Sequence, residues 1–247
     1  MVVLFMTRTP STGGGGGSQA SIDKVTSVSP ATLEQVGVPS DIKSVAPMPS
    51  GVPPVESGGL PVVTYIGAEY CPYCASERWP VTVALGRFGA FTDLGTTTSG
   101  PPPEPYPNTP TLSFHGSSYA SDYLVFSSAE TGDRFGNPLD TPTEQQQQLL
   151  DTYDTEQYTG SNGGIPFVMV DNLYAWAGTT YDPSVLEGLS FDEIAVELDD
   201  PNSPVAQQID GAANQITAMV CQATGNAPAD VCSAQYIQDA QAALQGQ

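Results

Sequence analysis

Short apolar runs separated by polar loops predict strands and helices that alternate along the chain. The run at residues 61–66 is rich in β-branched and aromatic residues and predicts a buried strand. Apolar positions then follow a helical spacing from Pro72 to Phe91, with a kink expected at a proline inside the run. In the second half, apolar runs at 167–170 and 173–177 flank a polar Asp171-Asn172 turn and predict a β-hairpin.

Weaker patterns complete the expected order of elements. Residues 111–115 and 123–126 are strand candidates, and the proline-rich stretch 95–110 is expected to be a loop. Further helices are predicted at 29–36, 143–153, 190–198, 204–221 and 229–244. Thr141 and Glu144 are expected to form a capping box for the second of these. A strand–helix–strand opening followed by a hairpin predicts an α/β fold, with a mixed sheet covered by helices on both faces.

The composition of the N-terminal residues predicts a flexible tether that lies outside the folded domain. Residues 1–6 are apolar, but six residues are too few to span a bilayer, which needs about twenty, or to form the core of a signal peptide. An apolar start followed by a Gly/Ser-rich stretch fits either the end of a membrane anchor or an ordinary extension. We therefore divide the chain into an anchor remnant and linker at 1–21 and a domain at 22–247.

The charge balance narrows the choice of partners. Six Lys and Arg residues face 27 Asp and Glu residues, which gives a formal net charge of −21. Such a surface repels nucleic acid, because phosphate binding relies on Lys and Arg, and it repels anionic lipid headgroups as well. A solvated acidic surface explains the excess, and it favours neutral or basic partners.

Cys71 and Cys74 form a Cys-x-x-Cys motif at a predicted strand–helix junction. Unpaired N–H groups at the start of a helix stabilise an anion, so the first cysteine is expected to ionise readily, and the thiolate is the attacking species. This arrangement indicates a redox pair, with Cys71 and Cys74 as catalytic residues. A structural disulfide and half of a metal site are the alternatives.

The other two cysteines, Cys221 and Cys232, have ten residues between them. Four thiolates suggest zinc, but structural zinc sites usually show two short knuckles and only the first pair has that spacing. We therefore expect no metal and no cofactor. The wider spacing suits a structural disulfide that links the last two helices; a second redox relay that exchanges with Cys71 is the alternative.

The segment Ala68–Cys74, with its aromatic residue before Cys-Pro-Tyr-Cys, resembles the active-site segment of thioredoxin-like proteins. Ile165-Pro166, just before the hairpin, resembles their cis-proline segment, and the Pro-Tyr dipeptide is similar to that of glutaredoxins. The resemblance implies a cis Ile165–Pro166 bond against Cys71, with Pro72, Tyr73, Ile165 and Pro166 contacting substrate. It also implies a thioredoxin-like fold with extra C-terminal helices. About ninety residues separate Cys74 from Pro166, so this fold would contain an insertion between them.

A second resemblance covers most of the chain after about residue 22. The stretches Ala75–Trp79 and Arg134–Leu139 resemble an uncharacterised prokaryotic family of membrane-anchored proteins, described only as a domain of unknown function. That family supplies no activity, so the functional expectation depends on the thioredoxin-like motifs.

The chain also departs from thioredoxins. Tyr65 stands where many thioredoxins have a buried acid, and Ala75 stands in place of a lysine. Proton transfer to or from Cys74 then needs another group. Glu69 and Glu77 are candidates, although solvated surface carboxylates are the expected role for both. The similarity to glutaredoxins ends at the dipeptide, so glutathione binding is not implied.

These features predict an extracytoplasmic thiol–disulfide oxidoreductase, membrane-anchored or secreted, that acts on protein thiols or disulfides. An anchored form would also have a membrane redox partner. The alternative is a non-catalytic thioredoxin-fold module that binds a protein partner and keeps Cys71–Cys74 as an inert disulfide. Copper delivery by the thiol pair is a third interpretation, which no Met-rich or His-rich stretch supports. The sequence leaves the direction of exchange open.

Overall fold

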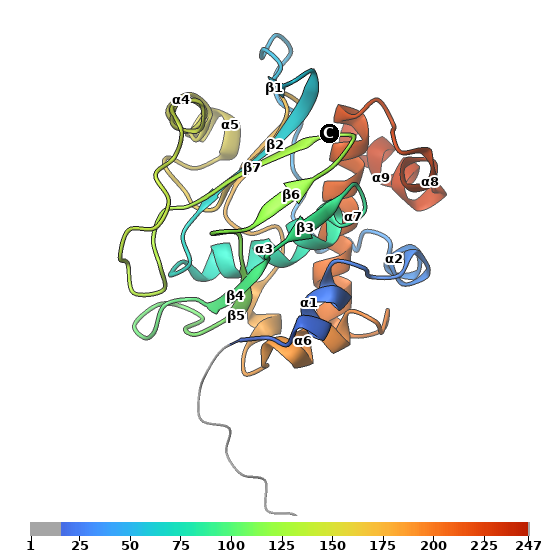
Figure 1. Cartoon of the computed structure of the whole chain (residues 1–247). Helices are drawn as coiled ribbons and strands as arrows, with labels where there is room; N and C mark the ends of the chain where they lie inside the picture. Colours follow the sequence, from blue (N-terminus) through green and yellow to red (C-terminus); the bar gives the residue numbers. More distant parts are fainter. Residues whose placement is uncertain (1–15, 247) are drawn as a thin grey trace, which may run out of the picture.

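A mixed five-stranded sheet forms the centre of the computed structural model, which describes residues 16–246 (Figure 1). Its strands are β1 (Glu56–Ser57), β2 (Leu60–Gly67), β7 (Val125–Glu130), β8 (Phe167–Val170) and β9 (Tyr174–Ala177). Strand β2 pairs in parallel with β7 and antiparallel with β1 and β8, and β9 extends the sheet beyond β8. The predicted α/β class with a mixed sheet is therefore confirmed, as are the strand at 61–66 and the hairpin.

Alternate residues of β2 face two separate cores. Val63 and Tyr65 contribute to the larger core, which includes residues of α3 (Pro72–Leu85) and α7 (Pro204–Ala223). Val62 and Ile66 contribute to a smaller core with Leu149 of α4 (Glu144–Tyr153). Because side chains alternate between the faces of a strand, this pattern places α3 and α7 on one face of the sheet and α4 on the other.

Shorter helices surround this centre. They are α1 (Gln19–Val25), α2 (Pro30–Val36), α5 (Glu156–Thr159), the 3-10 turn η1 (Pro183–Leu186), α6 (Phe191–Glu197), α8 (Ala229–Cys232) and α9 (Gln235–Gln245). The helices predicted at 29–36, 190–198 and 204–221 are confirmed within two residues. The single helix predicted at 229–244 is wrong, because the backbone is extended at Ala234 and separates α8 from α9. Helices α7, α8 and α9 lie together at one side of the molecule (Figure 1).

The segment between Cys74 and Pro166 contains two small antiparallel strand pairs. Strand β3 (Ala90–Thr92) pairs with β6 (Ser118–Ala120), and β4 (Gly95–Thr98) pairs with β5 (Pro110–Ser113). The helix predicted to reach Phe91 is therefore too long, and the loop predicted at 95–110 is wrong at both ends. Phe91 belongs to β3 because its ring packs in an aromatic cluster, with ring centroids 4.9 Å from Tyr119 and 5.8 Å from Phe126.

The helix predicted at 143–153 is confirmed within one residue, but two helix caps differ from the sequence prediction. Thr143, not Thr141, caps α4, and Gln146 rather than Glu144 completes the capping box. Ser18 caps α1, so residues 19–21 form helix rather than linker. Both assignments follow from the cap hydrogen bonds, which satisfy N–H groups that the helix itself leaves unpaired.

The expected anchor at 1–6 and most of the linker lie outside the described residues. Between residues 16 and 246, no helix combines the length and the apolar character needed to cross a membrane.

Candidate functional site

The Cys-Pro-Tyr-Cys segment lies where β2 ends and α3 begins. Cys71 is the N-cap of α3, and Pro72 stands in the first turn. The Cys71 N–H donates to the Ala68 carbonyl at 3.2 Å, and the Cys74 N–H donates to the Cys71 sulfur, also at 3.2 Å. Free N–H groups at the start of a helix favour an anion. The Cys71 sulfur therefore occupies the position at which this helix best stabilises a thiolate.

The two thiols of this segment differ in exposure and in acidity. Cys71 is 6% exposed, Cys74 is 0% exposed, and neither forms a disulfide. A hydrogen bond from the Cys74 side chain lowers the pKa of Cys71 below its ordinary value, although burial opposes it. Burial raises the pKa of the Cys74 thiol well above its ordinary value. Cys71 is therefore the thiol that ionises first.

The segment before the β-hairpin lies against this thiol. The Ile165–Pro166 peptide bond is cis, as predicted. The Cys71 thiol donates to the carbonyl oxygen of Ile165 at 3.5 Å, across 94 residues of sequence. Ile165 is half-buried, and Pro166 is buried and precedes β8 directly. The fold thus brings the four residues at 71–74 and the pair at 165–166 into one site, as the sequence patterns predict.

Aromatic and proline residues of the segment between Cys74 and Pro166 border the site. Tyr73, 39% exposed, makes an edge contact with Tyr106, with ring centroids 6.3 Å apart. The Gly100 N–H donates to the Tyr70 carbonyl at 2.8 Å, which ties the proline-rich loop to the residue before Cys71. A cavity of about 340 Å³ beside Tyr70 is lined by Gly100, Pro101, Pro102, Pro103, Glu104, Arg134, Phe135 and Gly136. No local sequence pattern indicates that these loops meet the cysteine motif.

The two acidic candidates are not solvated surface carboxylates. Glu77 is fully buried and accepts hydrogen bonds from Trp176 Nε1 at 3.0 Å and from the Thr180 N–H at 2.8 Å. Burial raises its pKa to about 7. Glu69 is half-buried and accepts hydrogen bonds from Ser113 Oγ at 2.6 Å and Thr97 Oγ1 at 3.1 Å. The expectation failed because it took charge alone as evidence of exposure.

A buried ion pair near the cysteines was also missed. Arg78 and Glu130 are both 0% exposed, and two guanidinium nitrogens, Nε and Nη2, donate to the Glu130 carboxylate at 2.7 Å each. Arg78 lies one helical turn after Cys74 within an almost entirely buried helix. The sequence signal for this ion pair is a basic residue four positions after Cys74 in a mostly apolar helix. Charged residues are rarely fully buried unless they are paired, so an arginine there indicates a buried acidic partner.

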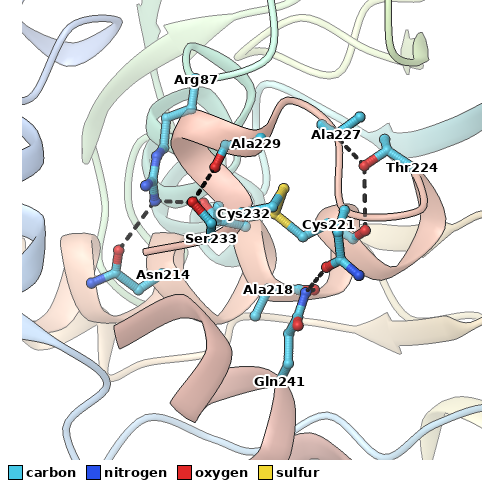
Figure 2. Close-up of a disulfide and its surroundings, with 12 residues drawn as sticks. Arg87, Asn214, Ala218, Cys221, Thr224, Ala227, Ala229, Cys232, Ser233 and Gln241 are labelled. Atoms are coloured by element: carbon cyan, nitrogen blue, oxygen red, sulfur yellow. Dashed lines mark hydrogen bonds between the residues drawn. A yellow bond between two sulfur atoms is a disulfide. The ribbon is translucent and has the colours of Figure 1, made fainter. Parts of the chain in front are cut away.

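The other cysteine pair forms a disulfide between the end of α7 and α8 (Figure 2). Cys221 and Cys232 are at most 1% exposed, with a sulfur–sulfur distance of 1.98 Å. Thr224 Oγ1 donates to the Ala227 carbonyl at 2.6 Å within the turn between α7 and α8, and Gln241 Nε2 of α9 donates to the Ala218 carbonyl of α7 at 3.4 Å. The pair therefore links helical segments of the C-terminal region.

Metal-ligating side chains are not concentrated in the described part of the chain. No group of three or more His, Cys, Asp or Glu side chains is arranged there to hold a metal ion. His115 follows β5, is exposed, and has its Nδ1 atom 2.7 Å from Asp140 Oδ1. This pairing lies outside the set of residues that surround Cys71.

Comparison with known proteins gives a family but no activity. No curated protein and no solved structure matches the chain significantly. A family model, whose description is Domain of unknown function (DUF929), matches residues 53–222. The matched segment is more than half of the chain and includes the site from Cys71 to Pro166 and the first cysteine of the disulfide. The chain belongs to this family of proteins with a domain of unknown function.

Proposed function

We propose that the chain is a thioredoxin-like thiol–disulfide oxidoreductase that acts outside the cytoplasm on protein thiols or disulfides. One observation supports this proposal above the others. Cys71 caps helix α3, and hydrogen bonds from the Cys74 side chain and backbone lower the pKa of its thiol, while the carbonyl of Ile165, next to Pro166, lies 3.5 Å from its sulfur. A nucleophilic thiol beside a backbone segment at the start of a strand suits attack on an extended substrate that pairs with that backbone.

In the reductive direction, the Cys71 thiolate attacks one sulfur of a substrate disulfide. A Cys71–substrate disulfide forms, the substrate S–S bond breaks, and the second substrate sulfur leaves as a thiolate. Cys74 then releases its proton and attacks the Cys71 sulfur, so that the mixed disulfide breaks. The released substrate thiolates take up protons from Cys74 and solvent. The substrate gains two electrons and becomes a dithiol, and Cys71–Cys74 becomes a disulfide; the oxidative direction is the reverse.

The second cysteine pair supports an extracytoplasmic location. The Cys221–Cys232 disulfide is buried and joins helical elements, and structural disulfides persist mainly in oxidising compartments. The acidic surface, with a net charge of −21, disfavours nucleic acid as a partner. In that setting a protein dithiol or disulfide is the substrate class, and a membrane redox partner would regenerate the pair.

The test uses the full chain and its Cys74→Ser variant. In glutathione redox buffers, the parent should form a Cys71–Cys74 disulfide reversibly, as read by mass spectrometry of alkylated protein. Incubated with ribonuclease A that contains scrambled disulfides, Cys74→Ser should accumulate a mixed disulfide through Cys71, because no second thiol can resolve it. The Cys71→Ser variant is the matched control and should trap nothing. A parent that forms no reversible disulfide, or a variant that traps no substrate, contradicts the proposal.

The exposed aromatic residues favour a second candidate, a binding module without exchange activity. Phe135 is 69% exposed and Tyr73 is 39% exposed beside the motif, and exposed aromatic residues commonly serve as interface anchors. This candidate predicts protein binding that Cys71→Ser leaves unchanged, whereas the oxidoreductase predicts binding that becomes covalent in Cys74→Ser.

A further inference from the structure

The buried ion pair between Arg78 and Glu130 lies directly behind the cysteine motif. Both side chains are 0% exposed, in a chain that has only six basic residues. Removing two charges from water costs several kcal/mol per ion, and a buried pair is often no more stabilising than apolar residues of similar size. Stability alone therefore does not explain why this pair lies inside α3 and β7.

Two short connections join the Arg78 guanidinium to the backbone of the two cysteines. Its Nη2 atom donates to the Ala68 carbonyl at 2.8 Å, and the same carbonyl accepts the Cys71 N–H at 3.2 Å. Its Cζ atom lies 5.9 Å from the centre of the Tyr65 ring, and the Tyr65 hydroxyl donates to the Cys74 carbonyl at 3.4 Å. One carbonyl thus separates the guanidinium from Cys71, and one aromatic ring separates it from Cys74.

One nitrogen of the guanidinium is an unpaired hydrogen-bond donor. Its Nη1 atom is buried and has no hydrogen-bond partner among the described residues. The charge of Arg78 lowers the pKa of Cys71 and opposes the upward effect of burial on the pKa of Cys74. The geometry and these directions agree that the positive end of the ion pair acts on the sulfurs.

We propose that Arg78 is a positioning residue of the thiol pair, whose buried guanidinium stabilises negative charge on the sulfurs of Cys71 and Cys74. Glu130 keeps the guanidinium in place and limits its effect. This inference rests on the proposed function for its purpose. The fixed cation assists ionisation of Cys74 without accepting its proton. That proton passes to the departing substrate thiolate, and the atoms and electrons of the exchange are unchanged.

The experiment measures the rate at which iodoacetamide alkylates Cys71 across pH in the reduced full chain. The double variant Arg78→Gln/Glu130→Gln removes both charges and keeps amide groups for hydrogen bonding. The pKa of Cys71 in this variant should rise by about one unit. At pH values below the pKa, the fraction of Cys71 present as thiolate should therefore be about tenfold smaller. Glu130→Gln keeps the cation and removes its counter-charge, so it should shift the pKa downward. Arg78→Lys should lie closer to the parent than the double variant does.

Opposite shifts separate an electrostatic role from a structural one, because simple loosening of the fold would move the pKa of both variants in the same direction. Arg87→Gln is the matched control: Arg87 is a second largely buried arginine, bonded to Tyr236 at 2.7 Å and Thr217 at 3.2 Å near the other disulfide. It should leave the Cys71 pKa unchanged.

An unchanged Cys71 pKa in the folded double variant, or shifts of the same sign in both variants, would overturn the proposal. If the double variant fails to fold, Glu130→Gln decides: a lowered pKa supports the role, and an unchanged or raised pKa overturns it. The measurement needs no substrate. Failure of the parent to form a reversible Cys71–Cys74 disulfide would therefore refute the oxidoreductase function separately, without changing the alkylation result.

Discussion

The two cysteine pairs of this chain use the same residue type in different surroundings. Cys71 and Cys74 lie in one turn at the N-terminus of α3, where the backbone N–H of Cys74 points to the Cys71 sulfur. Cys221 and Cys232 come from two helices, with a separation of 11 residues, and are joined by a disulfide. The first pair is free and the second is bonded.

What surrounds the sulfurs differs just as much. The first pair has a charged layer behind it, formed by Arg78 and Glu130, and exposed Tyr73 in front. The second pair belongs to the larger hydrophobic core and is covered by the turn between its helices (Figure 2). Each pair has a cis prolyl bond nearby, at Pro166 and Pro228. A backbone N–H donor to sulfur and a fully buried ion pair therefore distinguish the surroundings of the free pair from those of the bonded pair.

Removing the first pair should affect exchange activity, and removing the second pair should affect stability. The loss of activity should be the largest of the effects expected here. The Cys71→Ser variant should lose exchange activity on the order of a thousandfold or more, because it lacks the attacking sulfur. The double variant Cys221→Ser/Cys232→Ser should retain activity per folded molecule. Reduction of scrambled ribonuclease A, normalised to folded protein, measures both. Comparable losses in both variants would mean that the second pair takes part in exchange.

The stability of the two variants should show the reverse order. Loss of the Cys221–Cys232 disulfide should lower the free energy of unfolding by about 3 kcal/mol, because it frees a loop of about a dozen residues in the unfolded chain. The same relation gives a smaller effect for the four-residue loop that Cys71 and Cys74 would close. Urea unfolding of the oxidised parent and of both variants tests this order. A larger loss on breaking the short loop would invert the assignment of roles.

The comparison also explains how far the sequence could predict the site. The Cys-x-x-Cys spacing, the strand before it and the Ile165-Pro166 segment are local patterns, and the fold brings them together as expected. The Arg78–Glu130 pair joins residues 52 positions apart, and Glu77 meets Thr180 across 103 positions. Local patterns carry no information on such partners, so charge suggested exposure where the fold buries the group.

The same limit affected the fold. The strands at 61–66 and 167–170 were predictable because continuous apolar runs mark buried strands. Helix α3 was predicted to continue to Phe91 because the apolar spacing continues, but tertiary packing with Tyr119 and Phe126 draws that residue into a strand pair. Aromatic contacts formed by distant residues can override a helical pattern, and the sequence does not reveal which of the two wins.

The buried carboxyl of Glu77, which lies in the same helix as Cys74, should make the free energy of unfolding depend on pH. Burial raises its pKa from 4.5 to about 7, so the folded protein keeps a proton that the unfolded chain releases between these values. The contribution of Glu77 to stability is therefore largest below pH 4.5 and falls as pH rises to 7, by up to roughly 3 kcal/mol. In Glu77→Gln, this part of the decline should disappear.

Thermal or urea unfolding of parent and Glu77→Gln at pH 5 and pH 7 gives the two differences. The variant without the Cys221–Cys232 disulfide is the control, and its loss of stability should be similar at both pH values, because disulfide sulfurs do not titrate. An equal pH dependence in parent and Glu77→Gln would show that the Glu77 proton is not the cause.

The smallest expected effect lies within the first pair itself. In the reduced pair, iodoacetamide should modify Cys71 at least about tenfold faster than Cys74 at pH 7, because only the thiolate reacts and Cys74 is both buried and less acidic. Cys221 and Cys232 should stay unmodified until the protein is unfolded and reduced. Peptide mass spectrometry over a time course measures all four sites in one sample. Faster modification of Cys74 would exchange the roles of nucleophile and resolving thiol. Modification of Cys221 or Cys232 under native conditions would remove the distinction between a reactive pair and a structural one.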